Sequence, residues 1–132
     1  MLDDPRAVDI LEAISRLMRE TLMPALPPDV VFQARVAANA LDLVLRELRT
    51  GEKLEDDARA RLVKLLGVDA PLGELEAELS KRIRDGAIDL SETGLKEHLW
   101  ATTMAKMSID QPSYASYRRE LEARGSQQPD RG

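Results

Sequence analysis

The chain has 132 residues, of which 43% are hydrophobic and 33% charged, a size and composition that suit one folded domain and exclude a disordered chain. The net charge of −5 disfavours nucleic-acid binding and anionic membrane surfaces, and the absence of cysteine excludes disulfides, thiolate metal sites and thiol nucleophiles. Aromatic residues make up only 3%, so we expect an aliphatic core, which favours helices over sheets.

No segment has the pattern of an export signal or a membrane span. The first residues lack a basic region followed by an apolar run. The longest apolar stretch is interrupted by Gln33, Arg35, Asn39 and Asp42. We therefore expect a cytoplasmic protein that binds neither membranes nor nucleic acids.

The first expected helix has Asp4 as its N-cap and Pro5 at its first helical position, and Pro24 ends it. Its apolar residues recur at helical spacing, and charged residues take the opposite face. These apolar positions are Ile10, Leu11, Ile14, Leu17, Met18 and Leu22.

Residues 30–48 are apolar around most of a helical wheel. At about 100° per residue, the polar side chains of this segment fall within roughly 80° of arc. An ordinary surface helix shows an apolar stripe only on the order of 100° wide. The pattern predicts a central buried helix over about 30–50, ending at Gly51, with other helices packed around it. The polar strip consists of Arg35, Asn39, Asp42, Arg46 and Arg49.

The remaining sequence predicts further helices and no strand. Together they predict an all-α fold, a single-domain bundle of five to six helices over residues 1–124 with a disordered tail over 125–132. The later helices are a third over 55–66 before Gly67, a fourth from Pro71 to Gly86, a fifth from about Leu90 to Ile109 with a capping box at Asp89 and Glu92, and a sixth carrying Tyr114, Tyr117 and Leu121.

The polar strip of the central helix has two interpretations. It is either the one solvated edge of a buried helix, with Asp42 and Arg46 as a routine i, i+4 ion pair, or the lining of a groove between helices. In the groove, the guanidinium of Arg35 would bind a carboxylate or phosphate, and Asn39 would add a donor and an acceptor.

On the fifth helix, His98, Thr102 and Lys106 follow one another at i+4 steps and share a sector with Leu95 and Leu99. A partly buried His and Lys need partners, for which Asp42, Asp110 or a bound anion are the candidates. The alternatives are a structural histidine beside a lysine that reaches solvent, or a pocket for a small anion or acyl group between the central and fifth helices.

No catalytic residue, cofactor or metal site is predicted. A lone histidine without a nucleophile at a recognised spacing supports no triad, and the sequence offers no converging metal ligands. Residues 62–79 resemble a helix-turn-helix in length, but Glu74, Glu76 and Glu78 open the would-be recognition helix, which disfavours DNA binding. The face of Tyr114, Tyr117 and Leu121 is either the docking side of the last helix or a partner-binding surface.

Three runs of sequence carry a resemblance over roughly residues 5–118. They are residues 32–41 with 47–51, residues 81–86, and His98-Leu99 leading to Lys106, Asp110, Pro112 and Tyr114. In these runs the chain resembles an uncharacterised family of small all-helical bacterial proteins. The resemblance implies genes placed beside aminoglycoside-phosphotransferase-like kinases and acyl-CoA dehydrogenases, and it carries no activity or catalytic residue.

Two functions remain open from the sequence. The first is a non-catalytic accessory or adaptor protein for a partner enzyme, which the resemblance implies to be an acyl-CoA dehydrogenase or a phosphotransferase-like kinase. The second is a small-ligand binding protein or minor enzyme that uses Arg35, Asn39, His98, Thr102 and Lys106. Apolar residues on the first or the sixth helix are also able to form a homodimer.

Overall fold

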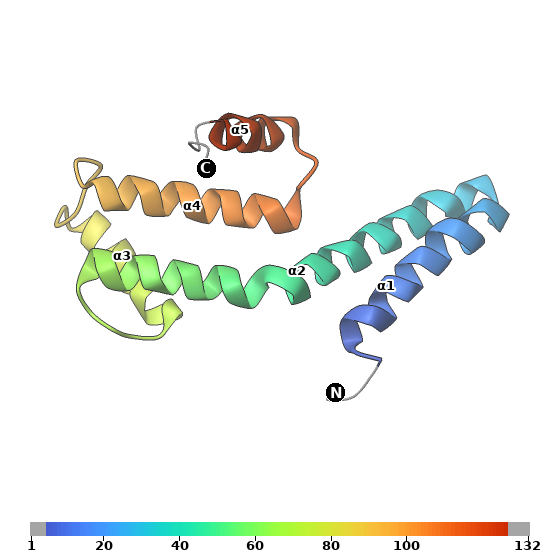
Figure 1. Ribbon diagram of the computed structural model, residues 1–132, viewed down its shortest axis with the longest axis horizontal. Helices are drawn as coiled ribbons and strands as arrows, with labels where there is room; N and C mark the ends of the chain where they lie inside the picture. The colour runs from blue at the N-terminus through green and yellow to red at the C-terminus, as the bar shows by residue number, and fades with distance from the viewer. Residues whose placement is uncertain (1–4, 127–132) are drawn as a thin grey trace, which may run out of the picture. The chain divides into compact units, whose positions relative to one another are not determined.

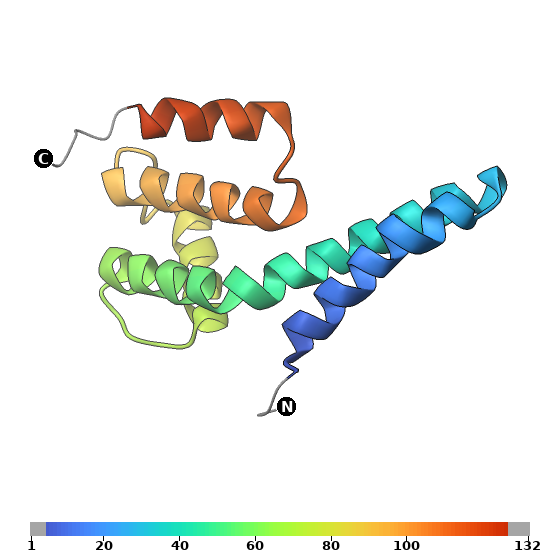
Figure 2. The ribbon, with the colours of Figure 1, turned by 45° about the vertical axis from the view of Figure 1, so that its right-hand side comes forward.

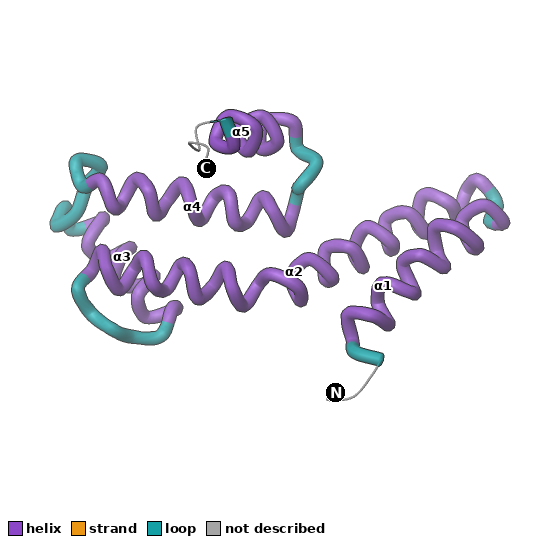
Figure 3. The backbone as a smooth tube through the Cα atoms, viewed as in Figure 1, coloured by secondary structure: helices purple, strands orange, loops and turns teal. Residues whose placement is uncertain are grey.

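The computed structural model describes residues 5–126, and these residues form helices and connections with no strand among them (Figure 3). The predicted all-α fold is therefore confirmed, with five α-helices in the described part of the chain. They are α1 (Ala7–Leu17), followed by a π-helical turn (Met18–Leu22) and a 3-10 turn (Met23–Ala25), then α2 (Pro28–Leu66), α3 (Leu72–Arg84), α4 (Thr93–Asp110) and α5 (Ala115–Gly125) (Figure 1).

The described residues fall into two compact units, divided between Glu52 and Lys53. The first unit contains α1 and the part of α2 up to Glu52. The second contains the rest of α2 together with α3, α4 and α5. The helix α2 thus contributes a segment to each unit.

In the first unit, α1 and α2 lie side by side and antiparallel, as Figures 1 and 2 both show. Three polar contacts between the two helices establish that they are antiparallel. As the residue number rises along α1, the number of the bonded residue on α2 falls. They are Glu12 with Arg49 at 3.0 Å, Ser15 with Asp42 at 2.6 Å, and Arg19 with Asn39 at 2.9 Å. The two helices form a hairpin whose polar contacts lie along one side.

The segment predicted to be the central helix is helical, but it is more exposed than predicted. Ala38 and Leu45 are buried, whereas Phe32 is 68% and Val36 52% exposed. Within the first unit this part of α2 packs on one side against α1, so only the side facing α1 is covered. A wide apolar arc shows which side chains would gain from burial. It does not show whether other helices are present to cover them.

The start of α1 differs from the prediction. The helix begins at Ala7 with Arg6 as its N-cap, and the backbone N–H of Arg6 donates to Asp9 Oδ2 at 3.1 Å. Asp4, the predicted cap, lies outside the described residues. So does most of the predicted tail, since residues 127–132 are not described and Gly125 is the last residue of α5.

Gly51 does not end the second helix, and the predicted helices over 30–50 and 55–66 are one continuous helix. Gly51 lacks the positive φ of a helix-ending glycine, which Gly67 and Gly86 both have at 72°. Gly67 ends α2 as predicted, and Nη1 of Arg82 donates to the free carbonyl of Leu66 at 3.1 Å.

We expect Gly51→Ala to raise the free energy of unfolding by about 0.5–1 kcal/mol, because alanine loses less backbone entropy in a helix. The added Cβ meets Oε1 of Glu47 at 2.8 Å, but this atom ends a flexible, exposed side chain that can rotate away. Denaturant unfolding measures the change. Gly67→Ala is the matched control and should destabilise the protein, since its φ of 72° disfavours a residue with a Cβ. A destabilising Gly51→Ala would contradict this account of the helix.

The second unit has the larger aliphatic core. It forms where the end of α2, α3 and the start of α4 meet, and Ala70, Leu72 and Ile88 pack around it. Leucines at helical spacing on each helix supply it, as the i, i+3 and i+4 patterns predict. The buried members are Leu62, Leu66, Leu75, Leu79 and Leu95.

The helix α4 carries apolar residues on two opposite sides, one of which is buried in the core while the other contacts α5. Leu95, His98 and Ile109 are buried on one side, and Trp100 lies on the other. There, Cζ of Arg124 on α5 lies 5.4 Å from the centre of the Trp100 ring, a cation–π contact. Figures 1 and 2 show α5 beside α4. The last helix therefore docks on α4.

The start of α4 is later than predicted. Glu92 is its N-cap rather than the partner in a capping box. Asp89 instead accepts hydrogen bonds from the backbone N–H and the hydroxyl of Ser91, which lower the pKa of its carboxyl. A carboxylate shortly before a helix can bond to the residue two positions on and form a turn, or cap the helix, so the sequence spacing alone did not distinguish the two.

None of the helices in residues 5–126 has the length and apolar character needed to cross a membrane.

Candidate ligand-binding site

The sequence-predicted site residues divide between the two units. Arg35 and Asn39 lie on α2 in the first unit, and His98, Thr102 and Lys106 lie on α4 in the second. Thr102 contacts His98, with Oγ1 and Nε2 3.5 Å apart. Lys106, one turn further along, is exposed, as is Arg35.

Most of the polar strip on α2 serves to hold α1. Asp42 accepts hydrogen bonds from Ser15 at 2.6 Å and from Arg19 at 2.6 Å, and Asn39 accepts one from Arg19. Partial burial alone would raise the pKa of Asp42, but the hydrogen bonds from Ser15 and Arg19 outweigh it and lower the pKa. These contacts hold α1 against α2, a role that neither interpretation drawn from the sequence included.

The one histidine of the chain is buried and bonded to an arginine. His98 is 5% exposed, and Nε of Arg61 on α2 donates to its Nδ1 at 3.3 Å. A guanidinium has no acceptor, so Nδ1 of His98 must carry a lone pair and the ring must be neutral. The proton then resides on Nε2, which points at the hydroxyl of Thr102.

The surroundings of His98 lower its pKa below the ordinary value of 6.5. Burial is the largest cause, and the positive charge of Arg61 acts in the same direction. The carboxylate of Glu76 acts weakly in the opposite direction. The hydrogen-bond geometry and the electrostatics thus agree on a neutral imidazole near pH 7.

We expect the protein to lose stability as the pH falls below about 6.5, the ordinary pKa of histidine. Between this value and the lower pKa of the folded state, the unfolded chain binds a proton that the folded chain does not, so unfolding is favoured. Above this window the imidazole is neutral in both states. Denaturant unfolding at a series of pH values should show this loss in the wild type and not in His98→Gln. An equal pH dependence in both proteins would refute it.

Arg61 is the residue that sequence reasoning missed. It lies one turn before Leu65 on the apolar side of the helix that was predicted over 55–66. An arginine in that position is a signal for a buried polar contact, because a charged group on a packed face needs a partner. Its contact with His98 joins residues 37 apart in the sequence, so no local pattern points to it.

The guanidinium of Arg61 is only partly bonded. Its Nη2 is buried and has no hydrogen-bond partner among the described residues. Leaving a buried donor unpaired costs about 1–3 kcal/mol, and more when the group is charged. An acceptor such as a ligand oxygen or an ordered water would remove that cost.

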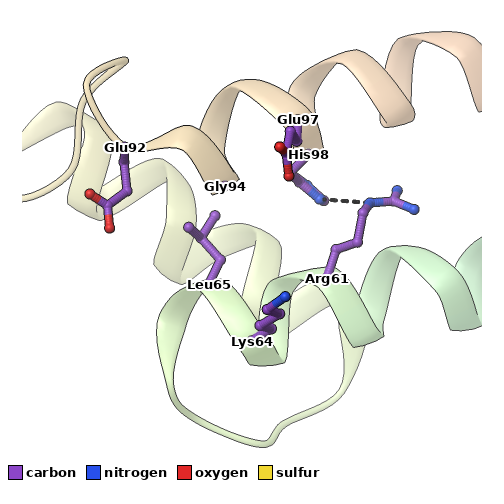
Figure 4. A pocket seen from close by; sticks show the side chains of 7 residues that line it. All are labelled: Arg61, Lys64, Leu65, Glu92, Gly94, Glu97 and His98. Atoms are coloured by element: carbon purple, nitrogen blue, oxygen red, sulfur yellow. Dashed lines mark hydrogen bonds between the residues drawn. The ribbon is translucent and has the colours of Figure 1, made fainter. Parts of the chain in front are cut away.

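A cavity of about 290 Å³ opens beside this pair, between α2 and α4 (Figure 4). Figure 4 shows Arg61 projecting from α2 to meet His98 of α4, with Leu65 and Gly94 where the helices face each other. A Cβ on Gly94 would lie 3.1 Å from Cδ1 of Leu65, so the glycine allows the close approach. The full lining is Arg61, Lys64, Leu65, Glu92, Gly94, Glu97 and His98.

The cavity has a cationic side and an acidic side. Arg61 and Lys64 come from α2, and Glu92 and Glu97 from the start of α4. Such a lining can bind a small molecule with a carboxylate or phosphate at one end and a hydrogen-bond donor at the other. No group of three or more metal-ligating side chains converges in the described part of the chain.

Comparison with known proteins yields one family. Residues 24–114 match the domain of unknown function DUF6285, a stretch that includes all of α2 and α3, all of α4, and the cavity between α2 and α4. The comparisons with curated proteins and with solved structures give no match. Because the matched stretch covers more than half of the sequence, the chain belongs to the DUF6285 family.

Proposed function

We propose that the second unit is a small-ligand binding module that holds a carboxylate or phosphate group at Arg61. The observation that carries this proposal is that Arg61 lines an open cavity and keeps one donor, Nη2, without a partner among the described residues. Nη2 is itself buried, so a ligand in the cavity reaches it only when the guanidinium turns toward the cavity. The bond from Nε to His98 holds Arg61 at the edge of the cavity. Lys64 adds a second positive charge to the same cavity.

The volume and charges of the cavity define the ligand class. A volume of about 290 Å³ lies at the lower end of ligand pockets, which suits a small acid, an amino acid or an acyl phosphate. Glu92 and Glu97 repel a simple dianion and favour a ligand that also carries an ammonium or hydroxyl group. Small zwitterions and hydroxy acids therefore fit the cavity better than inorganic phosphate.

Binding rather than catalysis is proposed because the nitrogen of His98 that would act as a base is already bonded. In this tautomer only Nδ1 has a basic lone pair, and it accepts the hydrogen bond from Arg61. In this account His98 is a positioning residue for Arg61.

A thermal-shift screen tests the proposal, because a ligand that binds only the folded state raises its melting temperature. The probes are amino acids, small hydroxy acids, acetyl phosphate, acyl-CoAs and inorganic phosphate. At a concentration 100-fold above its Kd, a ligand should raise the free energy of unfolding of the wild type by about 2.7 kcal/mol.

Two variants make this screen specific. Arg61→Gln should abolish the ligand-induced shift, whereas Arg84→Gln, which removes the same charge from an exposed site on α3 outside the cavity lining, should preserve it. An equal shift in the wild type and Arg61→Gln, or no shift with any probe, would overturn the proposal.

A second candidate is the accessory role, in which the protein docks on an acyl-CoA dehydrogenase or a phosphotransferase-like kinase in the cytoplasm. The observation that favours it is that large apolar side chains are exposed on α4, at the N-cap of α5 and on α5. Trp100 is 43%, Tyr114 53% and Leu121 47% exposed. Tryptophan and tyrosine dominate the binding energy of many interfaces.

Affinity purification from native lysate tests the accessory role. Mass spectrometry should identify one of these two enzymes when the wild type is used as bait. The control variant Leu90→Glu, which changes another exposed leucine of the second unit, should recover the same enzyme. Leu121→Glu should lose the enzyme, because a buried unpaired carboxylate opposes docking. Failure to recover either enzyme above background, or recovery that Leu121→Glu does not reduce, would reject this role.

A further inference from the structure

The first unit has an apolar surface that its own helices do not cover. We call it the hairpin face; it comprises Ile10, Ile14 and Leu17 of α1 with Val44 and Leu48 of α2. The exposed fraction ranges from 38% at Ile10 to 53% at Leu48. A groove of about 340 Å³ with an almost wholly apolar lining runs along its α1 side, past Ile10, Ile14 and Leu17.

Helical spacing places these residues on the side of the hairpin away from its polar contacts. On α1, Glu12, Ser15 and Arg19 recur at i, i+3 and i+7 and bond to α2. Ile10, Ile14 and Leu17 recur on a separate stripe.

On α2 the same division holds. Asp42 and Arg49 bond to α1 along one edge, whereas Leu41, Val44 and Leu48 recur at i, i+3 and i+7 along the other. The two apolar stripes therefore share one side of the antiparallel pair.

The first unit buries little on its own. Among residues 5–52, the buried positions are Ser15, Ala38, Leu45 and Gly51, so only one large apolar side chain is fully enclosed. Two helices with so small a shared core are marginal, because most helical stability comes from burying an apolar face. Burial of the hairpin face would supply the apolar contacts that the first unit lacks.

We propose that the hairpin face binds the same face of a second copy of this chain, so that two hairpins form a four-helix bundle. A two-fold axis brings identical surfaces together, so the face must be complementary to itself. The five residues that define it carry no charge, and Asp9, the charged residue in the lining of the α1 groove, is paired with Arg6. Two copies can therefore meet without like-charge repulsion or unpaired buried charge.

The available area reaches the lower limit for a specific dimer. The run from Ala7 to Ala25 is about 27 Å long at roughly 1.5 Å per residue, and two helices side by side are about 20 Å wide. The whole side of the hairpin, including the residues that flank the hairpin face, thus offers about 500 Å² per copy, and the pair buries at most about 1,000 Å², the lower bound for a biological interface. Antiparallel helix pairs that meet through apolar stripes are the usual construction of four-helix bundles.

Sedimentation equilibrium of the full chain tests the proposal. Over micromolar concentrations the wild type should have twice the chain mass of 14.7 kDa. A double variant, Ile14→Lys with Val44→Lys, should sediment as a monomer, and Phe32→Lys, an exposed apolar position outside the hairpin face, should remain a dimer. A monomeric wild type, or a double variant that stays dimeric, would overturn the proposal.

Charge complementation separates loss of the interface from loss of folding. A second double variant, Ile14→Glu with Val44→Glu, should also be monomeric by itself. An equimolar mixture of the lysine and glutamate variants should regain the dimer mass, because opposite charges then meet across the two-fold axis. A mixture that stays monomeric would count against contact through the hairpin face.

Discussion

Leu62→Ala should lower the free energy of unfolding of the second unit by about 2–5 kcal/mol. Leu62 is fully buried and contacts the cluster that joins α2, α3 and α4, including Leu75 and Leu95. Truncation removes the transfer free energy of three carbon atoms and leaves a cavity that the surrounding helices fill only in part. Denaturant unfolding, followed by circular dichroism, measures the loss.

The matched control is Leu90→Ala. Leu90 is 69% exposed, so the same substitution there should change the stability by less than about 0.5 kcal/mol. Comparable losses at the two positions would mean that the packing of the second unit differs from the core described above.

Asp42→Ala should destabilise the first unit by about 1–2 kcal/mol. The carboxylate accepts the hydrogen bonds of Ser15 and Arg19, and its loss leaves the buried hydroxyl of Ser15 without that acceptor. We place the value at the lower end for a charged group because the side chains of Arg19 and Asp42 are about a third exposed, at 36% and 34%. Hydrogen exchange of the α1 amides reports opening of this unit directly.

The sign of the pH effect follows from the lowered pKa of Asp42. Its contribution is fully present above the ordinary carboxyl pKa and is lost as the pH falls through the lower pKa of the folded state. Asp57→Ala is the control, because the ion pair of Asp57 with Lys53 is an exposed i, i+4 contact worth about 0.2–0.5 kcal/mol. Equal effects of the two substitutions would contradict the role given to Asp42.

The positions of the helices could be predicted because local sequence determines them. Gly67 ends a helix where expected, and the apolar spacing locates α3, α4 and α5 to within a few residues. Pro24 does not end the first helix as predicted, because α1 ends at Leu17 and Pro24 lies inside the 3-10 turn that follows the π-helical turn. The prediction that Gly51 ends the second helix was wrong, since a helix-ending glycine adopts a positive φ and Gly51 does not. The residues that follow, which continue a helical pattern, outweighed its weak helix propensity.

The burial of α2 and the partner of His98 could not be predicted because both depend on contacts between distant segments. The sequence indicates that a partly buried histidine at position 98 needs a partner, and the candidates it offers are a carboxylate or a bound anion. The structure supplies Arg61, which can bond only to a neutral imidazole. Asp42, one of the proposed partners, is instead bonded to Ser15 and Arg19.

NMR spectroscopy of the His98 side chain tests the proposed site most directly, because the chain contains one histidine and its ring signals need no assignment. We predict a pKa of His98 below about 6.5, the Nε2–H tautomer in the free protein, and an upward shift of the pKa when an anionic ligand binds at Arg61. An Nδ1–H tautomer with a pKa at or above the ordinary value would contradict it. That result would mean that Arg61 does not donate to His98, and the bond that holds Arg61 at the edge of the cavity would be absent.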